Sequence, residues 1–145
     1  MNNVIVKVIG VQKDIYGTEN CIETTAVGRY YLKNGVHYVT YQDRELEHNE
    51  AETTTVLKVY PGHVVLLRMG SIGHRQEFHP GQKTSSTYVT PYGSMSMTVF
   101  TTQINSSFGA ASGTIDISYE LEVDGQWQSE NVLTIIIQEG LNFGH

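Results

Sequence analysis

The stretch TIDISYELEVD, residues 114–124, decides the fold class of this chain. Apolar and polar residues alternate along it. One face would carry Ile115, Ile117, Tyr119, Leu121 and Val123, and the other Thr114, Asp116, Ser118, Glu120 and Glu122. A period of two is that of a β-strand with one buried face, whereas a helix would mix the two sets. The stretch therefore predicts a strand with one buried face and one solvent-exposed face.

A second stretch, GSMSMTVF at residues 93–100, repeats this alternation behind a Pro-Tyr-Gly break. We expect Met95, Met97 and Val99 to face the protein interior, while the serines and threonines between them face water. Methionine fills irregular gaps, so these two side chains fit either an ordinary core or a pliable ligand wall.

Turn signals separate about ten such strand segments, and no stretch is a convincing helix. Asn34-Gly35 and Pro61-Gly62 are typical of tight hairpin turns. At Asp124-Gly125 we prefer a three-residue loop, because a two-residue turn would place Gln128 opposite Leu121. SSFGAASG, residues 106–113, is expected to be a longer loop, and RELEHNEAE, residues 44–52, an acidic hairpin end in contact with solvent.

Short connections predict the topology. Neighbouring strands in the sequence should be neighbours in space, and no long crossover is available for a Greek key. Ten antiparallel strands in meander order would have two long exposed edges unless the sheet closes. We therefore expect an all-β protein with one domain, residues 1–145, folded as a single up-and-down antiparallel meander barrel of about eight to ten strands.

Charge and composition exclude several classes of protein. Nine Lys and Arg against fifteen Asp and Glu give a net charge of −6, which disfavours binding to nucleic acid or to an anionic membrane surface. The N-terminus MNNVIVKVIGV has no basic region ahead of an apolar run and is expected to be the first strand, not a signal peptide. The lone Cys21 excludes an internal disulfide, and we expect a cytoplasmic location.

Hairpin registers assign the inner face. The turn at Asn34-Gly35 pairs Gly28 with Tyr41, and the missing side chain at Gly28 leaves room for the Tyr41 ring. The turn at Pro61-Gly62 pairs Thr55 with Arg68. If the aliphatic face of that hairpin is the inner one, Arg68 points inward with Leu66.

The chain resembles the YwiB-like family of bacterial proteins, which have a calycin-type β-barrel related to lipocalins and fatty-acid-binding proteins. The resemblance rests on VGRYYLKNGVHYVTY, TTTVLKV with VVLLRMG, QEFHPGQ, YVTPYG with the methionine alternation, and GTIDISYELEVDG with NVLTIII. It covers nearly the whole chain and implies the barrel and a bacterial cytoplasm. It supplies no catalytic residue, because none of these segments is an active-site signature.

The candidate binding residues are the polar and flexible side chains expected inside the barrel: Arg68, Gln76, Tyr88, Met95, Met97, Tyr119 and Asn131. A few polar groups in an apolar concavity are typical of a small-molecule site, and equally of a satisfied internal network. Arg68 has the same two interpretations. It could anchor a ligand carboxylate, or it could be a structural arginine bonded inside the barrel.

No motif indicates a cofactor, a metal site or catalysis. The six histidines have no ligand spacing, and His74 and His79 fall on opposite faces of one strand, so we interpret them as scattered surface residues. There is no GxSxG motif, and a hydrolase or isomerase ranks third among the functions considered.

Two functions lead. The first is a barrel that binds a small hydrophobic or acidic molecule in its interior. The second is a filled barrel that recognises another protein through its outer face or rim, with Tyr31 and Tyr38 as contacts. A homodimer is left open.

Overall fold

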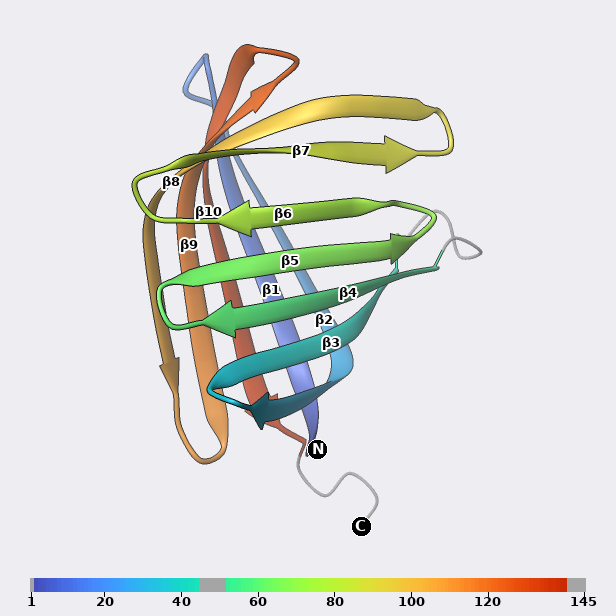
Figure 1. The fold of residues 1–145 in the computed structure, drawn as a ribbon, viewed down its shortest axis with the longest axis vertical. Coiled ribbons are helices and arrows are strands. Elements are labelled where there is room, and N and C mark those ends of the chain that lie inside the picture. The colour runs from blue at the N-terminus through green and yellow to red at the C-terminus, as the bar shows by residue number, and fades with distance from the viewer. Residues whose placement is uncertain (1, 45–51, 141–145) are drawn as a thin grey trace.

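The computed structural model describes residues 2–44 and 52–140 of the chain, and every described element is a β-strand. The ten strands are β1 (Asn2–Asp14), β2 (Glu19–Lys33), β3 (Val36–Arg44), β4 (Glu52–Tyr60), β5 (His63–Gly70), β6 (His74–Phe78), β7 (Lys83–Thr90), β8 (Gly93–Phe108), β9 (Ser112–Val123) and β10 (Gln126–Glu139). They form one antiparallel sheet that coils around a common interior (Figure 1). Among the described residues no helix is long and apolar enough to cross a bilayer.

The first strand pairs with the last, and the sheet is open between β6 and β7, which come from the middle of the chain. The strand order is β6-β5-β4-β3-β2-β1-β10-β9-β8-β7, so the first and last strands are paired and the two sheet edges are β6 and β7. The β1–β10 ladder runs from Val4 opposite Glu139 to Asp14 opposite Ser129. The expected all-β meander is confirmed, and the sheet is nearly closed into a barrel.

The predicted hairpin registers are confirmed. Gly28 lies opposite Tyr41 and Thr55 opposite Arg68, as predicted, and in the next hairpin Tyr88 lies opposite Met95. At Gly28 an added Cβ would come within 2.4 Å of the Thr40 carbonyl oxygen and 3.1 Å of the Tyr41 Cβ. The wall of the barrel therefore needs glycine at this position.

The three-residue loop predicted at Asp124 was wrong at the turn, where it would have paired Val123 with Trp127, and gave the right register farther along the hairpin. Val123 pairs with Gln126 across a two-residue turn, in which Asp124 and Gly125 both have positive φ. A bulge between Trp127 and Ser129 then absorbs Gln128. Because the bulge adds one residue, Tyr119 lies opposite Asn131, which is the pairing that a three-residue loop without a bulge would give.

The expected loop at residues 106–113 is also corrected. Strand β8 continues to Phe108 and β9 begins at Ser112, so the connection is short. The β8 strand takes up a bulge of its own between Thr101 and Gln103. The acidic hairpin end expected at residues 44–52 lies largely outside the described residues.

The interior is filled by aliphatic side chains from nearly every strand. The core cluster consists of Val4, Val6, Val39, Tyr41, Leu57, Val59, Val64, Leu66, Phe78, Val99, Ile115, Ile117, Ile135 and Ile137. Burying side chains of this kind is the main stabilising contribution to the fold. Among the described residues, five buried ones are polar: Thr53, Thr55, Gln76, Thr101 and Ser129. Of these, only Gln76 belongs to the interior residues expected from the sequence.

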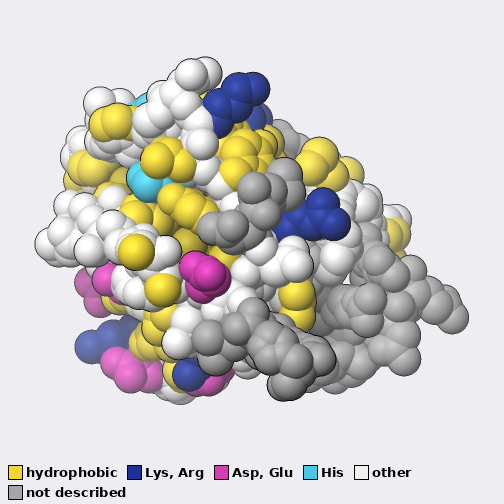
Figure 2. Space-filling view, turned by 90° about the horizontal axis from the view of Figure 1, so that it is seen from below, with side chains coloured by type: hydrophobic (Ala, Val, Ile, Leu, Met, Phe, Trp, Pro, Cys, Tyr) yellow, Lys and Arg dark blue, Asp and Glu magenta, His cyan; other side chains and the backbone are white. Residues whose placement is uncertain are grey.

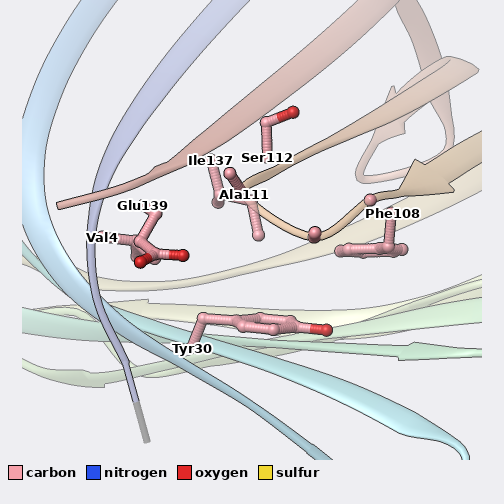
Figure 3. Close-up of a pocket in the computed structure, with 9 residues that line it drawn as sticks. Val4, Tyr30, Phe108, Ala111, Ser112, Ile137 and Glu139 are labelled. Carbon is pink, nitrogen blue, oxygen red and sulfur yellow. The ribbon is translucent and has the colours of Figure 1, made fainter. Parts of the chain in front are cut away.

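One end of the barrel is closed by a stack of rings. The Phe108 ring lies 3.7 Å from the His37 ring and 5.9 Å from the Tyr30 ring, and the Tyr30 hydroxyl is 2.6 Å from His37 Nδ1. Seen from this end, hydrophobic side chains gather in the middle of the surface with a histidine among them (Figure 2). Figure 3 shows Tyr30 and Phe108 in the small hollow beside this stack, whose volume of about 20 Å³ has room for little more than a water molecule.

Candidate functional site

The candidate site is a cavity of about 140 Å³ beneath the open side of the barrel. Its walls come from β5 to β10 and are mostly apolar. The residues that line it are Leu66, Arg68, His74, Gln76, Phe78, Tyr88, Met97, Val99, Tyr119, Leu121 and Leu133. None of these side chains is a carboxylate. A mainly apolar cavity with a few polar groups on one side is the usual form of a small-molecule site.

Side chains replace backbone pairing along the gap between β6 and β7, which we call the seam (Figure 1). At one end of the seam, Gly73 and Val89 exchange backbone hydrogen bonds of 2.9 and 2.8 Å. At the other end, in the turn that joins β6 to β7, Gly81 N donates to Thr101 O of β8 over 2.7 Å. Between these two points, polar side chains of β6 meet polar side chains of β7.

Gln76 is the centre of the contacts across the seam. Its Nε2 donates to Thr84 Oγ1 over 3.0 Å and to the Glu77 carbonyl oxygen over 2.8 Å. Its Oε1 accepts from Ser86 Oγ over 2.8 Å. Thr84 Oγ1 also donates to Glu77 O over 2.5 Å, and His74 Nε2 lies 2.9 Å from Ser86 Oγ. These contacts satisfy the buried Gln76 and join the two sheet edges.

Arg68 brings a positive charge to the cavity. It lies on β5. Burial and the charge on Arg68 lower the pKa of His74, whereas burial raises the pKa of Tyr119 and the charge on Arg68 opposes that rise, so all three side chains share one neighbourhood. Arg68 also makes a further interaction within the protein. The arginine is therefore not without a partner in the absence of a ligand.

His74 is a cavity-lining residue that sequence reasoning missed. Its side chain lines the cavity, its ring meets the Tyr88 ring edge-on at 5.2 Å, and burial together with the charge on Arg68 lowers its pKa to about 4. The interpretation of this histidine as a surface residue was wrong. A signal was present, because His74 lies two residues from Gln76 on a strand and therefore shares its face.

Five of the seven predicted residues come together. Arg68, Gln76, Tyr88, Met97 and Tyr119 line the same cavity. Burial raises the pKa of the Tyr119 phenol, which keeps it protonated, and its ring lies 5.2 Å from that of Phe78. Whether these residues bind a ligand stays a prediction.

Met95 does not face the interior, contrary to expectation. It lies opposite Tyr88 near the Pro91–Gly93 turn, and its side chain is 38% exposed. The pairing of β8 with β9 begins at Met97, so Met95 has only the neighbouring strand β7 beside it. The alternation was correct, but the barrel wall ends before Met95.

Asn131 also lies away from the cavity. Its amide donates to Ser129 Oγ over 2.9 Å, and it lines a neighbouring hollow of about 310 Å³ that shares only Tyr119 with the cavity. Although this hollow is larger, it is bordered by exposed charged side chains, among them Lys13, Glu19 and Glu130. Charged groups of this kind are well solvated, so contacts with them contribute little binding free energy to a small ligand. We therefore take the cavity at Arg68 as the candidate site.

The fold and the cavity define an all-β meander barrel with a small interior hollow. The family model described as "Domain of unknown function (DUF1934)" matches residues 6–135, and the chain belongs to this family. It is 28% identical over 124 residues to the "Uncharacterized beta-barrel protein YwiB" of Bacillus subtilis (strain 168), which covers 86% of this chain and 85% of that protein. The solved "Crystal structure of ywiB protein from Bacillus subtilis" has a TM-score of 0.86 at 26% identity and covers 96% of this chain and 92% of that one. The family resemblance seen in the sequence is confirmed.

Proposed function

We propose that this barrel binds a small, partly apolar organic acid in the cavity beneath the seam. The observation that carries the proposal is the composition of the cavity wall, in which Arg68 stands among apolar side chains and no lining residue is a carboxylate. The low pKa of His74 and the high pKa of Tyr119 leave both groups uncharged at neutral pH. Arg68 is therefore the one charged side chain among the residues that line the cavity, and it favours an anion whose remaining surface is apolar.

The size of the cavity limits the ligand. An enclosed volume of about 150 Å³ is enough for a benzene-sized molecule. At about 140 Å³ the cavity suits a short or monocyclic acid, such as butyrate or benzoate, but not a long fatty acid. The proposed ligands are therefore smaller than the fatty acids that the resemblance to lipocalins and fatty-acid-binding proteins suggests. It keeps the cytoplasmic location that the single cysteine favours.

The proposal is tested by thermal-shift and calorimetric titrations of butyrate, benzoate and palmitate. We expect the two small acids to raise the melting temperature of the wild type in proportion to ligand occupancy, and palmitate to have no effect. Arg68→Met should abolish the response. Arg75→Met is the matched control, because Arg75 is an exposed arginine on β6 whose partner is Glu77. A wild type that responds to none of the acids, together with an Arg68→Met variant that barely folds, would defeat the proposal.

Recognition of another protein through the outer face is the second candidate. It is favoured by Tyr31 and Tyr38, which lie together on the outer face of β2 and β3, with Lys58 Nζ 6.0 Å from the Tyr38 ring. The two tyrosine rings stack on each other at 4.7 Å, which already covers part of their surface without a partner. We therefore rank this function below acid binding.

A further inference from the structure

One edge of strand β2 has no neighbouring strand over most of its length. Residues 19–27 pair with β1 on one side, whereas the pairing of β2 with β3 on the other side begins only at Gly28, opposite Tyr41. The residues of β3 that would continue this ladder, 42–44, pair with β4 and not with β2. Within the part of the chain that the structure describes, no other strand pairs with residues 19–27. The backbone groups on this side of β2 are therefore open to a partner strand.

This edge lacks the features that usually prevent a strand edge from pairing. Proteins protect such edges with proline, lysine, a bulge or a covering segment. Residues 19–25, with the sequence ENCIETT, contain no proline or lysine, and all seven are exposed. Their register with β1 is continuous from Glu19 opposite Lys13 onward, without a bulge. A regular, exposed edge of this kind is a template for another β-strand.

The two glutamates of the edge have partners on β1. Lys7 Nζ lies 3.1 Å from Glu23 Oε2, and Lys13 stands opposite Glu19 in the ladder. These lysines offset the negative charge along the edge, since opposite charges on neighbouring strands attract each other. The repulsion between two such edges is therefore reduced.

The order of residues along the edge suits pairing with a second copy of the same edge. A two-fold axis through Ile22 would place the Ile22 side chains of two antiparallel copies opposite each other. The flanking pairs are then Asn20 with Thr24, and Cys21 with Glu23. No like charges meet in this register, whereas an axis through Glu23 would place two glutamates together. Ile22 is 68% exposed, so the pairing would also bury apolar surface.

We propose that two copies of this chain associate through residues 19–25 of β2, so that their sheets join across a two-fold axis at Ile22. Exposed apolar residues near the two ends of the edge support this arrangement. Tyr16, in the β1–β2 turn, is 85% exposed, and Val27 is 72% exposed. They lie six and five residues from Ile22 on opposite sides, so the axis would bring Tyr16 of one copy close to Val27 of the other.

Sedimentation velocity at a series of protein concentrations tests the dimer. We expect the wild type to dimerise, and Ile22→Lys to raise the dissociation constant at least about tenfold, because two ammonium groups would face each other at the axis. The fold should be retained, since Ile22 is exposed. Val132→Lys is the matched control, because Val132 is also exposed and apolar but has a paired strand on each side.

Two results would overturn the dimer. One is a wild type that remains monomeric at millimolar concentration, which would leave the edge to a strand of another protein. The other is a dimer that is equally stable in Ile22→Lys and Val132→Lys, which would place the contact elsewhere on the molecule.

Disulfide formation tests the register of the two edges. In a Cys21→Ser background, Ile22→Cys would place two cysteines opposite each other, at a Cα separation of roughly 4.5–5.5 Å that a disulfide can span. Thr24→Cys is the control, because the two positions would lie about 14 Å apart. We expect Ile22→Cys to crosslink under mild oxidation and Thr24→Cys to remain uncrosslinked. No crosslink at residue 22, or an equal one at residue 24, would overturn the axis at Ile22.

Discussion

At the scale of single residues, Gly28 shows how closely the neighbouring strands β2 and β3 approach each other. Its position is buried, and the nearest atoms to an added Cβ include the Thr40 carbonyl oxygen, which belongs to the backbone and cannot turn away. Val6 and Tyr41 crowd the same point from the interior. A single hydrogen in place of a side chain therefore lets β2 pass beside β3 without displacing the core.

We expect Gly28→Ala to destabilise the protein by about 1–3 kcal/mol or more, because the strand must shift to relieve the contact. Gly10→Ala is the matched control. Gly10 is also a strand glycine, but an added Cβ there meets nothing within 4 Å. This second change should be neutral or slightly stabilising, since alanine reduces the freedom of the unfolded chain. Urea midpoints measure both, and equal losses would contradict the crowding at Gly28.

His74 should make stability depend on pH. Its pKa is about 4 in the folded protein, because burial and the charge on Arg68 disfavour the imidazolium, against an ordinary value of 6.5. As pH falls from above 6.5, the unfolded chain gains a proton that the folded chain does not, so stability declines until pH reaches about 4 and then levels off. The loss should be about 2 kcal/mol, allowing for the partial exposure of the ring.

His74→Gln isolates this effect, because glutamine can still donate to Ser86 but does not titrate. The variant should lose less stability than the wild type between pH 6.5 and 4. Glu77 titrates in a lower window. Hydrogen bonds from His79 and Arg75 lower its pKa from 4.5 to about 2, so its stabilisation is lost as pH falls through that range in both proteins. If the free energies of unfolding of the wild type and His74→Gln changed with pH in the same way throughout, a buried, neutral His74 would be contradicted.

At the scale of elements, the seam is the part of the sheet that side chains hold together. The β1–β10 ladder has eleven paired positions, whereas β6 and β7 share only the isolated bridge between Gly73 and Val89. The remaining hydrogen bonds come from side chains, namely those of His74, Gln76, Thr84 and Ser86. These side-chain bonds are therefore expected to control how readily β6 and β7 separate.

We expect Gln76→Leu to destabilise the protein by about 1–3 kcal/mol, because Ser86 and Thr84 lose buried partners. Amide hydrogens of β6 and β7 should also exchange faster, as the two edges open more often. Ser85→Ala is the matched control on the outer face of β7, where the hydroxyl makes an exposed contact with Thr98. It should change stability by less than about 0.5 kcal/mol. Unchanged exchange in Gln76→Leu would show that the seam does not depend on this network.

At the scale of the whole molecule, the sequence predicted the parts of the structure that are set locally. Alternation placed Tyr88, Met97 and Tyr119 on the inner face, and the turn residues set the pairing of Gly28 with Tyr41, because strand period and turn type are short-range properties. Met95 could not be assigned in this way. Its exposure depends on where β9 ends beside β8, and that is a property of two distant segments.

The position of the seam could not be predicted from the sequence either, because it also depends on segments that are far apart in the chain. Barrel closure depends on the accumulated twist and stagger of all the strands, so no local pattern shows that β6 and β7 stay apart. The bulge at Gln128 was missed because an extra residue in one strand leaves the alternation beyond it intact. The interior position of His74 could have been predicted, because His74 lies two residues from Gln76 on the same strand. It was missed because the histidines were considered only as metal ligands, by their spacing.

The central claim is that the hollow beneath the seam admits a small acid, and methyl spectra of the methionines test it most directly. Met97 lines the cavity, whereas Met95, two residues away on β8, is 38% exposed and lies outside it. On titration with benzoate, the account predicts a saturable shift of the Met97 methyl resonance and no comparable shift of Met95. In Arg68→Met, a folded protein should show neither shift. A Met97 resonance that stays fixed at saturating benzoate, or a shift confined to Met95, would contradict the account.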